Sequence, residues 1–330
     1  MTTLSPVPPG EIEALARERA DARAAGDYAR ADALRARIEA AGWRLVDHGI
    51  AFRLEPAAPP TIEDGDVVRY GSADAVPSLL DEPATAPFTV VALAADRPDD
   101  TTRLLAGLRA HAPAGTQVVI VANEPPSAPA SASSPAPDGA DVAPVAGSPP
   151  ELLRTSVRLG HAAALNIGMR RARGSIVVLV DPSIEPTGDA LGPLADALAD
   201  PSVAVAGGSG VAGAGLRHLV EAPGPDVDAI VSGWCAFRRS DVSSLGPLDE
   251  RFVLDAHLDV WWSLVLRTGR DAGRPARRAV RIDLPLVLHE RREDATLPVA
   301  ERERLAKRNF YRVLDQFRER TDLFSGSSSS

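Results

Sequence analysis

A short acidic turn follows a run of branched aliphatic residues near the middle of the chain. Residues 176–180 read Ile-Val-Val-Leu-Val, and the run breaks at Asp181-Pro182, with Ser183 and Glu185 close behind. A carboxylate at the carboxyl end of a parallel strand is where α/β proteins usually hold a ligand. Asp-Pro and Ser also end strands for purely local reasons. The turn therefore predicts either a ligand site or a plain strand terminator, and the flanking elements must decide.

The elements around this turn predict a parallel sheet. Residues 88–126 read as strand, loop, helix and strand, a βαβ unit whose two strands must be parallel. The predicted fold class is α/β, with a mostly parallel, Rossmann-like sheet flanked by helices. We expect further helices at 160–172, 188–199, 257–268 and 299–319, and strands at 202–210 and 226–240.

The first 57 residues predict a separate small unit. Residues 11–41 have two apolar stripes of helical spacing, with Gly26 suited to end the first helix and Asp27 to cap the second. Two short strands are expected around a turn at residues 48–49. The predicted organisation is a hairpin unit at 1–57, a linker at 58–86 carrying at most one small hairpin, a main domain at 87–324 with a disordered insertion at 125–150, and a disordered tail at 325–330.

Composition narrows the class of protein. The 330 residues are 45% hydrophobic and 25% charged, as in soluble globular proteins, and a net charge of −9 argues against a DNA-binding surface. The single cysteine, Cys235, excludes an internal disulfide and the usual zinc clusters. No apolar run approaches the roughly 20 residues of a membrane span, and the N-terminus lacks the apolar core of a signal peptide. We therefore expect a cytoplasmic protein.

Three later stretches follow the βαβ unit in a fixed order. They are "GHAAALNIGMRRARGSIVVLVDPS", "GPLDERFVLDAHLDVWWSLVLRTG" and "LPLVLHERRE". Because these stretches occur in this order after the βαβ unit, residues 87–320 resemble the family 2 glycosyltransferases of the GT-A fold. The first stretch resembles the segment that leads into the family's Asp-x-Asp strand, and the second resembles the segment whose helix supplies a catalytic Asp. The last stretch places His289 where the family has a histidine near a metal.

The resemblance implies a chemistry and a set of residues. When the bond between the sugar and the nucleoside diphosphate breaks, negative charge builds on the diphosphate, and a Mg²⁺ or Mn²⁺ ion could stabilise that charge. A carboxylate would remove the proton of the acceptor hydroxyl. The implied catalytic base is Asp259, and the implied metal ligands are Asp181 and His289. Residues expected to bind the nucleotide-sugar donor are Ala94, Asp96, Asn123, Glu124, Asn166, Asp181 and Ser183. Residues expected to bind the acceptor are Trp234, His257 and Trp262.

The implied reaction is an inverting transfer to a carbohydrate or lipid-linked saccharide, and a lipid-linked acceptor would bring the protein to the inner face of the membrane. Two positions depart from the family pattern. The third position of Asp-x-Asp is Ser183, a poor metal ligand, and the usual Glu-Asp pair reads Leu258-Asp259. We therefore expect the cation to bind weakly. A catalytically degenerate binding or scaffold protein of the same fold is the main alternative.

A second resemblance covers the N-terminal unit. Residues 15–56, "LARERADARAAGDYARADALRARIEAAGWRLVDHGIAFRLEP", resemble the C-terminal helical appendage of cysteinyl-tRNA synthetases. The resemblance implies a helical hairpin, and the chain has no synthetase catalytic domain. Because Arg-rich helix faces are usually solvated, we favour a docking module over a tRNA-binding one. An RNA-associated protein that works through this hairpin stays as a further alternative.

Overall fold

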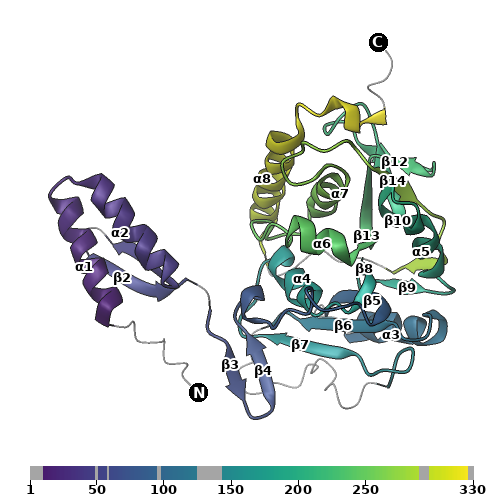
Figure 1. Ribbon diagram of the computed structural model, residues 1–330, viewed down its shortest axis with the longest axis horizontal. Helices are drawn as coiled ribbons and strands as arrows, with labels where there is room; N and C mark the ends of the chain where they lie inside the picture. The colour runs from purple at the N-terminus through teal and green to yellow at the C-terminus, as the bar shows by residue number, and fades with distance from the viewer. Residues whose placement is uncertain are drawn as a thin grey trace. The chain divides into compact units, whose positions relative to one another are not determined.

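The computed structural model describes residues 10–48, 51–57, 59–94, 98–124, 143–289 and 297–325. Contacts divide the chain into two compact units, residues 1–72 and 73–330, and each is described by itself (Figure 1). Within the described residues, no helix combines the length and the apolar character that crossing a bilayer requires.

The first unit contains the predicted helical hairpin. Its helices are α1 (Gly10–Ala24) and α2 (Tyr28–Ala40), followed by the antiparallel strands β1 (Trp43–His48) and β2 (Ala51–Pro56). Asp27 caps α2 as predicted, because its carboxylate accepts a hydrogen bond of 3.0 Å from the Arg30 amide. Ile12, Ile38 and Trp43 belong to the small core of this unit. The antiparallel strands β3 (Ile62–Asp64) and β4 (Val67–Tyr70) form a hairpin inside the predicted linker.

The second unit is built on one mixed sheet. Its strands run in the order β12-β14-β10-β13-β8-β5-β6-β7. Their bounds are β5 (Ala86–Ala94), β6 (Gln117–Ala122), β7 (Glu151–Thr155), β8 (Gly174–Val180), β10 (Val203–Ala212), β12 (Asp226–Val227), β13 (Ala229–Arg238) and β14 (Arg278–Arg281). The pairs β5–β6, β5–β8, β6–β7 and β10–β14 are parallel, whereas β13 runs antiparallel to both β8 and β10. Short β11 (Val220–Glu221) pairs with β10.

Helices cover both faces of this sheet (Figure 1). They are η1 (Ala73–Ala75), α3 (Pro98–His111), α4 (His161–Arg170), α5 (Gly192–Ala199), α6 (Arg239–Leu245), α7 (Leu258–Thr268), α8 (Val299–Phe317) and η2 (Thr321–Leu323). Leu104 of α3 and Leu194 of α5 share one core with Val90 of β5. Side chains alternate along a strand, so the next residue, Val91, faces the other side, where it meets α4 at Gly168. The α/β fold class predicted from the sequence is confirmed.

Gly168 sets the distance between α4 and the sheet. A Cβ atom at this position would lie 2.4 Å from Val91 Cγ1 and 3.2 Å from Val121 Cγ2. We expect Gly168→Val to lower the free energy of unfolding in urea by about 2–3 kcal/mol, because the core has no room for the added methyl groups. Gly224→Val is the matched control, since a Cβ there meets only the Asp226 carbonyl at 4.0 Å. Equal stability of the two variants would contradict this packing.

The structure also corrects the predicted elements. The sequence patterns do not predict β7 or β14. They also do not predict that β9 (Ile184–Pro186) pairs with β15 (Leu286–Leu288). Residues 125–142 of the predicted insertion lie outside the described residues. Residues 143–150 form a turn in which Val145 is fully buried, so this end of the segment belongs to the core.

Candidate active site

Three parallel strands end at the same edge of the sheet. β5, β6 and β8 end at Ala94, Ala122 and Val180, and their carboxyl ends point the same way. Ala94, Asn123 and Asp181 are therefore brought to one edge, as the sequence predicts. Asp96 lies outside the described residues, and Glu124 is exposed at the end of a described segment.

Asp181 begins a tight turn that its own carboxylate stabilises. Its Oδ1 accepts hydrogen bonds from the Ser183 amide at 2.9 Å and from the Ser183 hydroxyl at 2.7 Å. The Asp181 amide donates to the Gly233 carbonyl of β13 at 2.7 Å. Gly233 has a φ of 72°. The turn is thus a local strand terminator of the Asx type, and it holds a half-buried carboxylate at the edge where β5, β6 and β8 end.

Residues 184–186 and 286–288 bring a second polar pair to the same turn. β9 and β15 pair in antiparallel register, Ile184 opposite Leu288, and the His289 amide donates to the Ser183 carbonyl at 2.9 Å. Just beyond, His289 Nε2 lies 2.7 Å from Glu185 Oε2, and both side chains are about one-third exposed. The structure therefore joins His289 to the Asp181 turn as predicted and adds Glu185, for which the sequence alone supplies no direction.

The Glu185 contact gives a measurable prediction. Glu185→Ala should weaken binding of the nucleoside diphosphate that the family resemblance implies, by about 3- to 10-fold, because a charge-assisted hydrogen bond no longer orients His289. Glu185→Gln should retain most of the affinity, since its amide can still bond to the imidazole. Calorimetric titration of the two variants measures the difference. Equal loss in both would show that charge, and not orientation, is what Glu185 supplies.

The donor set at this turn does not fit a cation held by the protein alone. In the part of the chain that the structure describes, no three His, Cys, Asp or Glu side chains gather closely enough to hold a metal. Asp181 Oδ1 is taken up by Ser183, and His289 Nε2 is taken up by Glu185. Asp181 and His289, the two residues that the sequence predicts as metal ligands, therefore already use these atoms in hydrogen bonds within the protein.

Asp259 approaches the sheet from the first turn of α7. Its Oδ1 accepts a hydrogen bond of 2.8 Å from the Val260 amide. Burial, and then the negative charge of Asp259, raise the pKa of the Cys235 thiol on β13. Cys235 lies opposite Leu179 on β8, two residues before Asp181. Asp259 thus lies close to the end of the strand that carries the acidic turn.

Two amide side chains that are predicted to bind the donor form hydrogen bonds to neighbouring loops. Asn123 accepts a hydrogen bond from the Leu159 amide at 2.8 Å and donates to the Leu159 carbonyl at 2.9 Å. Asn166 is buried and donates to the Leu248 carbonyl and to Glu250 Oε1, at 3.0 and 3.1 Å. Asn166 Oδ1 accepts from the Leu248 amide at 2.8 Å. Both side chains thus position loops beside the edge. Buried Asn166 has both amide N–H groups engaged, which corrects its predicted role, whereas donor binding by Asn123 stays a prediction.

The predicted acceptor tryptophans lie in the core. Trp234 and Trp262 are each 1% exposed, and the Trp262 ring packs edge-on against Phe237 with centroids 5.5 Å apart. Neither ring has a face open to an acceptor, which corrects that prediction. His257 differs, because it is half-buried at the N-cap of α7 with its ring 5.5 Å from Phe310. Burial lowers the pKa of His257, which favours the neutral imidazole.

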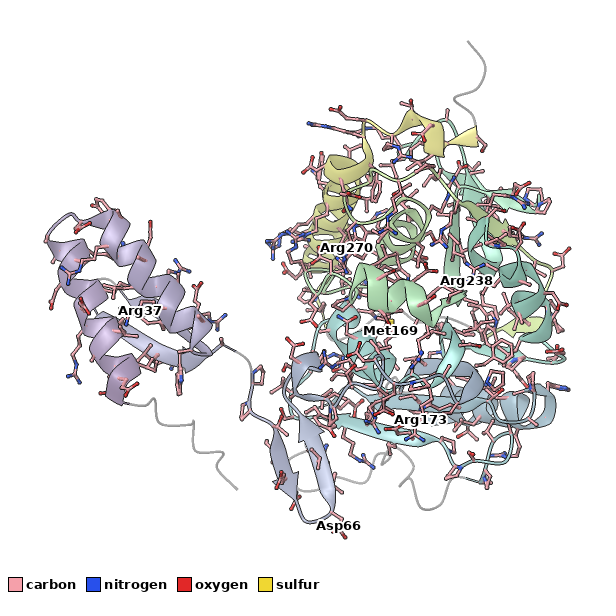
Figure 2. The ribbon with its side chains drawn as sticks, in the orientation of Figure 1. Arg37, Asp66, Met169, Arg173, Arg238 and Arg270 are labelled. Atoms are coloured by element: carbon pink, nitrogen blue, oxygen red, sulfur yellow. The ribbon has the colours of Figure 1, made fainter. Side chains whose placement is uncertain are left out.

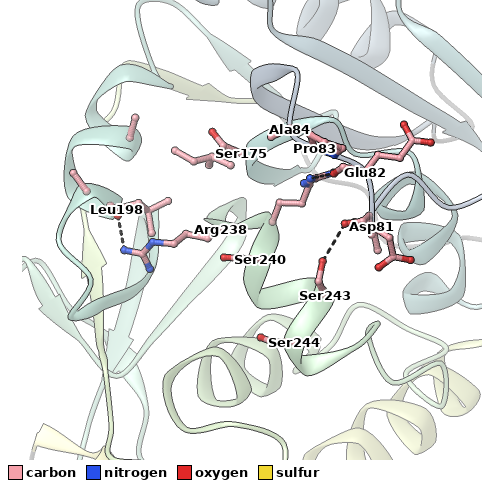
Figure 3. A pocket seen from close by; sticks show the side chains of 15 residues that line it. Asp81, Glu82, Pro83, Ala84, Ser175, Leu198, Arg238, Ser240, Ser243 and Ser244 are labelled. Carbon is pink, nitrogen blue, oxygen red and sulfur yellow. Dashed lines mark hydrogen bonds between the residues drawn. The ribbon is translucent and has the colours of Figure 1, made fainter.

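An open depression lies at the opposite end of β8, between α5 and α6 (Figure 3). Its two arginines are engaged by main-chain carbonyls. Arg238 donates to Val203 at 2.7 Å and to Asp200 at 2.8 Å, and Arg239 donates to Leu79 at 2.9 Å and to Ala172 at 3.2 Å. Figure 2 shows Arg238 among the side chains of the second unit. These guanidinium groups stabilise the fold by linking main-chain segments, so they do not mark a ligand site. The candidate site remains the edge where β5, β6 and β8 end.

The fold is that of the GT-A glycosyltransferases. The chain is similar to the crystal structure of GalNAc-T7 with UDP, GalNAc and Mn²⁺, with a TM-score of 0.55 and 13% sequence identity, over 72% of this chain and 50% of that one. The chain therefore spans about half the length of that neighbour. A mannosyltransferase from Pyrobaculum calidifontis in complex with GDP-Man and Mn²⁺ overlaps less well, with a TM-score of 0.44, 18% identity and coverage of 64% and 60%, and adds no weight.

Two sequence matches accompany the fold. Residues 96–224, less than half of the chain, match the family described as Glycosyl transferase family 2. Over 49 residues the chain is 51% identical to the cysteine–tRNA ligase of Opitutus terrae, which covers 15% of this chain and 11% of the ligase. The first match agrees with the resemblance drawn from the Asp181 region. The second is too short to transfer an activity.

Proposed function

We propose that this protein is a glycosyltransferase that moves a sugar from a nucleotide-sugar donor to a carbohydrate or lipid-linked saccharide. One observation carries the proposal: Asp181, Ser183, Glu185 and His289 gather at the edge where β5, β6 and β8 end. Ligands of open α/β sheets bind at that edge. The family match over 96–224 supports the reaction class. We further propose a cytoplasmic site of action, at the inner face of the membrane where the acceptor is lipid-linked.

The proposed transfer is a direct displacement at the anomeric carbon. The acceptor oxygen forms a bond to that carbon while the bond to the diphosphate oxygen breaks, and its electron pair leaves with the nucleoside diphosphate. Asp259 takes the proton of the acceptor hydroxyl as the oxygen attacks. A single displacement with one base inverts the anomeric configuration.

On the donor side, hydrogen-bond donors at the acidic turn would meet the diphosphate. The imidazole of His289 is the group we assign to it, with Glu185 orienting His289. The donor would be a UDP-, GDP- or dTDP-sugar. We assign no step to Mg²⁺ or Mn²⁺, since the donor set does not fit a protein-held cation.

Donor turnover tests this proposal. The full chain is incubated with UDP-, GDP- and dTDP-sugars, with and without Mn²⁺, in the presence of a panel of saccharides. Release of nucleoside diphosphate with transfer of the sugar from one donor class is the expected result. Absence of turnover with every donor and acceptor would contradict the transferase proposal.

One observation favours a second candidate function, nucleotide binding without transfer. Ser183 occupies the third position of the acidic motif, and its hydroxyl is spent on Asp181. A protein that binds the nucleotide without catalysing transfer would bind a nucleoside diphosphate but would not release it from a nucleotide-sugar. Calorimetry beside the turnover assay separates the two candidates.

A further inference from the structure

An aromatic and cationic cluster lies beside the N-terminus of α7. Arg217 lies over the Phe310 ring, with its guanidinium carbon 5.5 Å from the ring centroid. The same ring is 5.5 Å from the His257 ring and 5.9 Å from the Tyr311 ring. His257 precedes Asp259 by two residues. The cluster therefore lies at the start of the helix that carries the carboxylate to which we assign the proton of the acceptor.

Hydrogen bonds to buried groups hold the elements that contribute to the cluster in place. Asn309, buried on α8, donates hydrogen bonds to the Ala256 carbonyl at 3.0 Å and to the Leu254 carbonyl at 3.3 Å. The loop that carries Arg217 starts at Gly213, whose amide donates to buried Asp228 at 2.8 Å. Such anchoring holds the aromatic rings and the guanidinium in a defined arrangement before any ligand arrives.

His257 shows that this arrangement costs backbone energy. Its φ is 64°, in the left-handed region that residues with a side chain adopt at a cost of roughly 1–3 kcal/mol. The strained residue directly precedes α7, the helix that carries Asp259. Strain of this kind persists where surrounding contacts fix it, and here Phe310 and the Asn309 bonds do so.

The charge of Arg217 is available to a ligand. Arg217 is exposed, and among the described residues no carboxylate forms an ion pair with it. A guanidinium held over an aromatic ring still presents its N–H groups at its edge, where a carboxylate or phosphate accepts two hydrogen bonds.

We infer that Arg217 and Phe310 form the acceptor-binding surface of the proposed transferase, and that the acceptor is an anionic saccharide. This inference rests on the proposed function. Phe310 and His257 would contact the sugar ring through their aromatic faces, and Arg217 would bind its carboxylate or phosphate. The acceptor hydroxyl then lies toward Asp259.

Two matched ligand pairs test the inference on the full chain. Methyl glucuronide against methyl glucoside isolates a carboxylate, and glucose 6-phosphate against glucose isolates a phosphate. Dissociation constants from ligand-observed NMR should favour the anionic member of at least one pair by about 3- to 10-fold. The pair that shows the preference identifies the anion.

Variants assign the preference to the cluster. Arg217→Gln should abolish the preference, whereas Phe310→Ala should weaken both members of the pair alike. Arg173→Gln removes the same charge from an exposed position at the amino end of β8, opposite the site, and should change nothing. Equal affinity within both pairs, no binding of any of the four ligands, or a preference that survives in Arg217→Gln would overturn the inference.

Titration with UDP and GDP on the same samples keeps the two proposals apart. Nucleoside diphosphate binding without an anion preference overturns the acceptor inference and leaves the donor site standing. If neither UDP nor GDP binds to wild type, the proposed function itself is contradicted.

Discussion

Asp259→Asn is expected to lower the rate of sugar transfer by at least about 100-fold while nucleoside diphosphate affinity changes less than about twofold. Asn has the shape of Asp and can still accept the hydrogen bond from the Val260 amide. It cannot take a proton from the acceptor at neutral pH. The loss should therefore appear in kcat, because the interaction that is removed exists only as the hydroxyl loses its proton.

Asp255→Asn is the matched control for this variant. Asp255 is exposed, lies four residues earlier in the turn before α7 and carries the same charge. We expect its transfer rate to stay close to that of wild type. A larger loss in Asp255→Asn than in Asp259→Asn, measured as initial rates at saturating donor, would remove the base role from Asp259.

Gly233→Ala should have the second large effect, on both stability and donor binding. A Cβ at Gly233 would lie 2.5 Å from Asp181 Cβ, and the φ of 72° disfavours any side chain. Together these penalties should lower the free energy of unfolding by about 2–4 kcal/mol. Since the Asp181 amide is bonded to the Gly233 carbonyl, the acidic turn would shift, and nucleoside diphosphate affinity should fall about 10-fold or more.

Gly147→Ala separates backbone strain from displacement of the turn. Gly147 also has a positive φ, 93°, but a Cβ there meets nothing within 4 Å. This variant should lose stability in urea denaturation and keep its nucleoside diphosphate affinity. If Gly233→Ala binds as tightly as Gly147→Ala, Gly233 does not hold the acidic turn in place.

Local patterns predicted the elements that carry their own periodicity. The βαβ unit from β5 through α3 to β6, the hairpin of α1 and α2, and the long helices α7 and α8 all appear near their expected positions. β9 and β15 have three residues each and pair across about 100 residues of chain. Strands that short have no internal pattern, so only the tertiary fold determines them.

The same distinction explains the candidate site. The position of Asp181 follows from its own strand, and the sequence predicted it. The pairing of Glu185 with His289 depends on β9 meeting β15, and the sequence predicted no direction for Glu185. Trp234 and Trp262 were predicted as acceptor contacts because exposed and buried aromatic residues look alike in sequence, and packing against residues such as Phe237 placed them in the core.

Calorimetric titration of UDP and GDP into wild type and Asp181→Ala, each with and without Mn²⁺, is the most direct test of whether the turn after β8 receives a nucleoside diphosphate. We predict that at least one nucleotide binds to wild type and that its affinity falls by about 10-fold or more in Asp181→Ala, because the Ser183 amide and hydroxyl lose the oxygen that accepts their hydrogen bonds and the turn loses its geometry. Identical affinities in the two proteins, or no binding to wild type under either condition, would contradict the account.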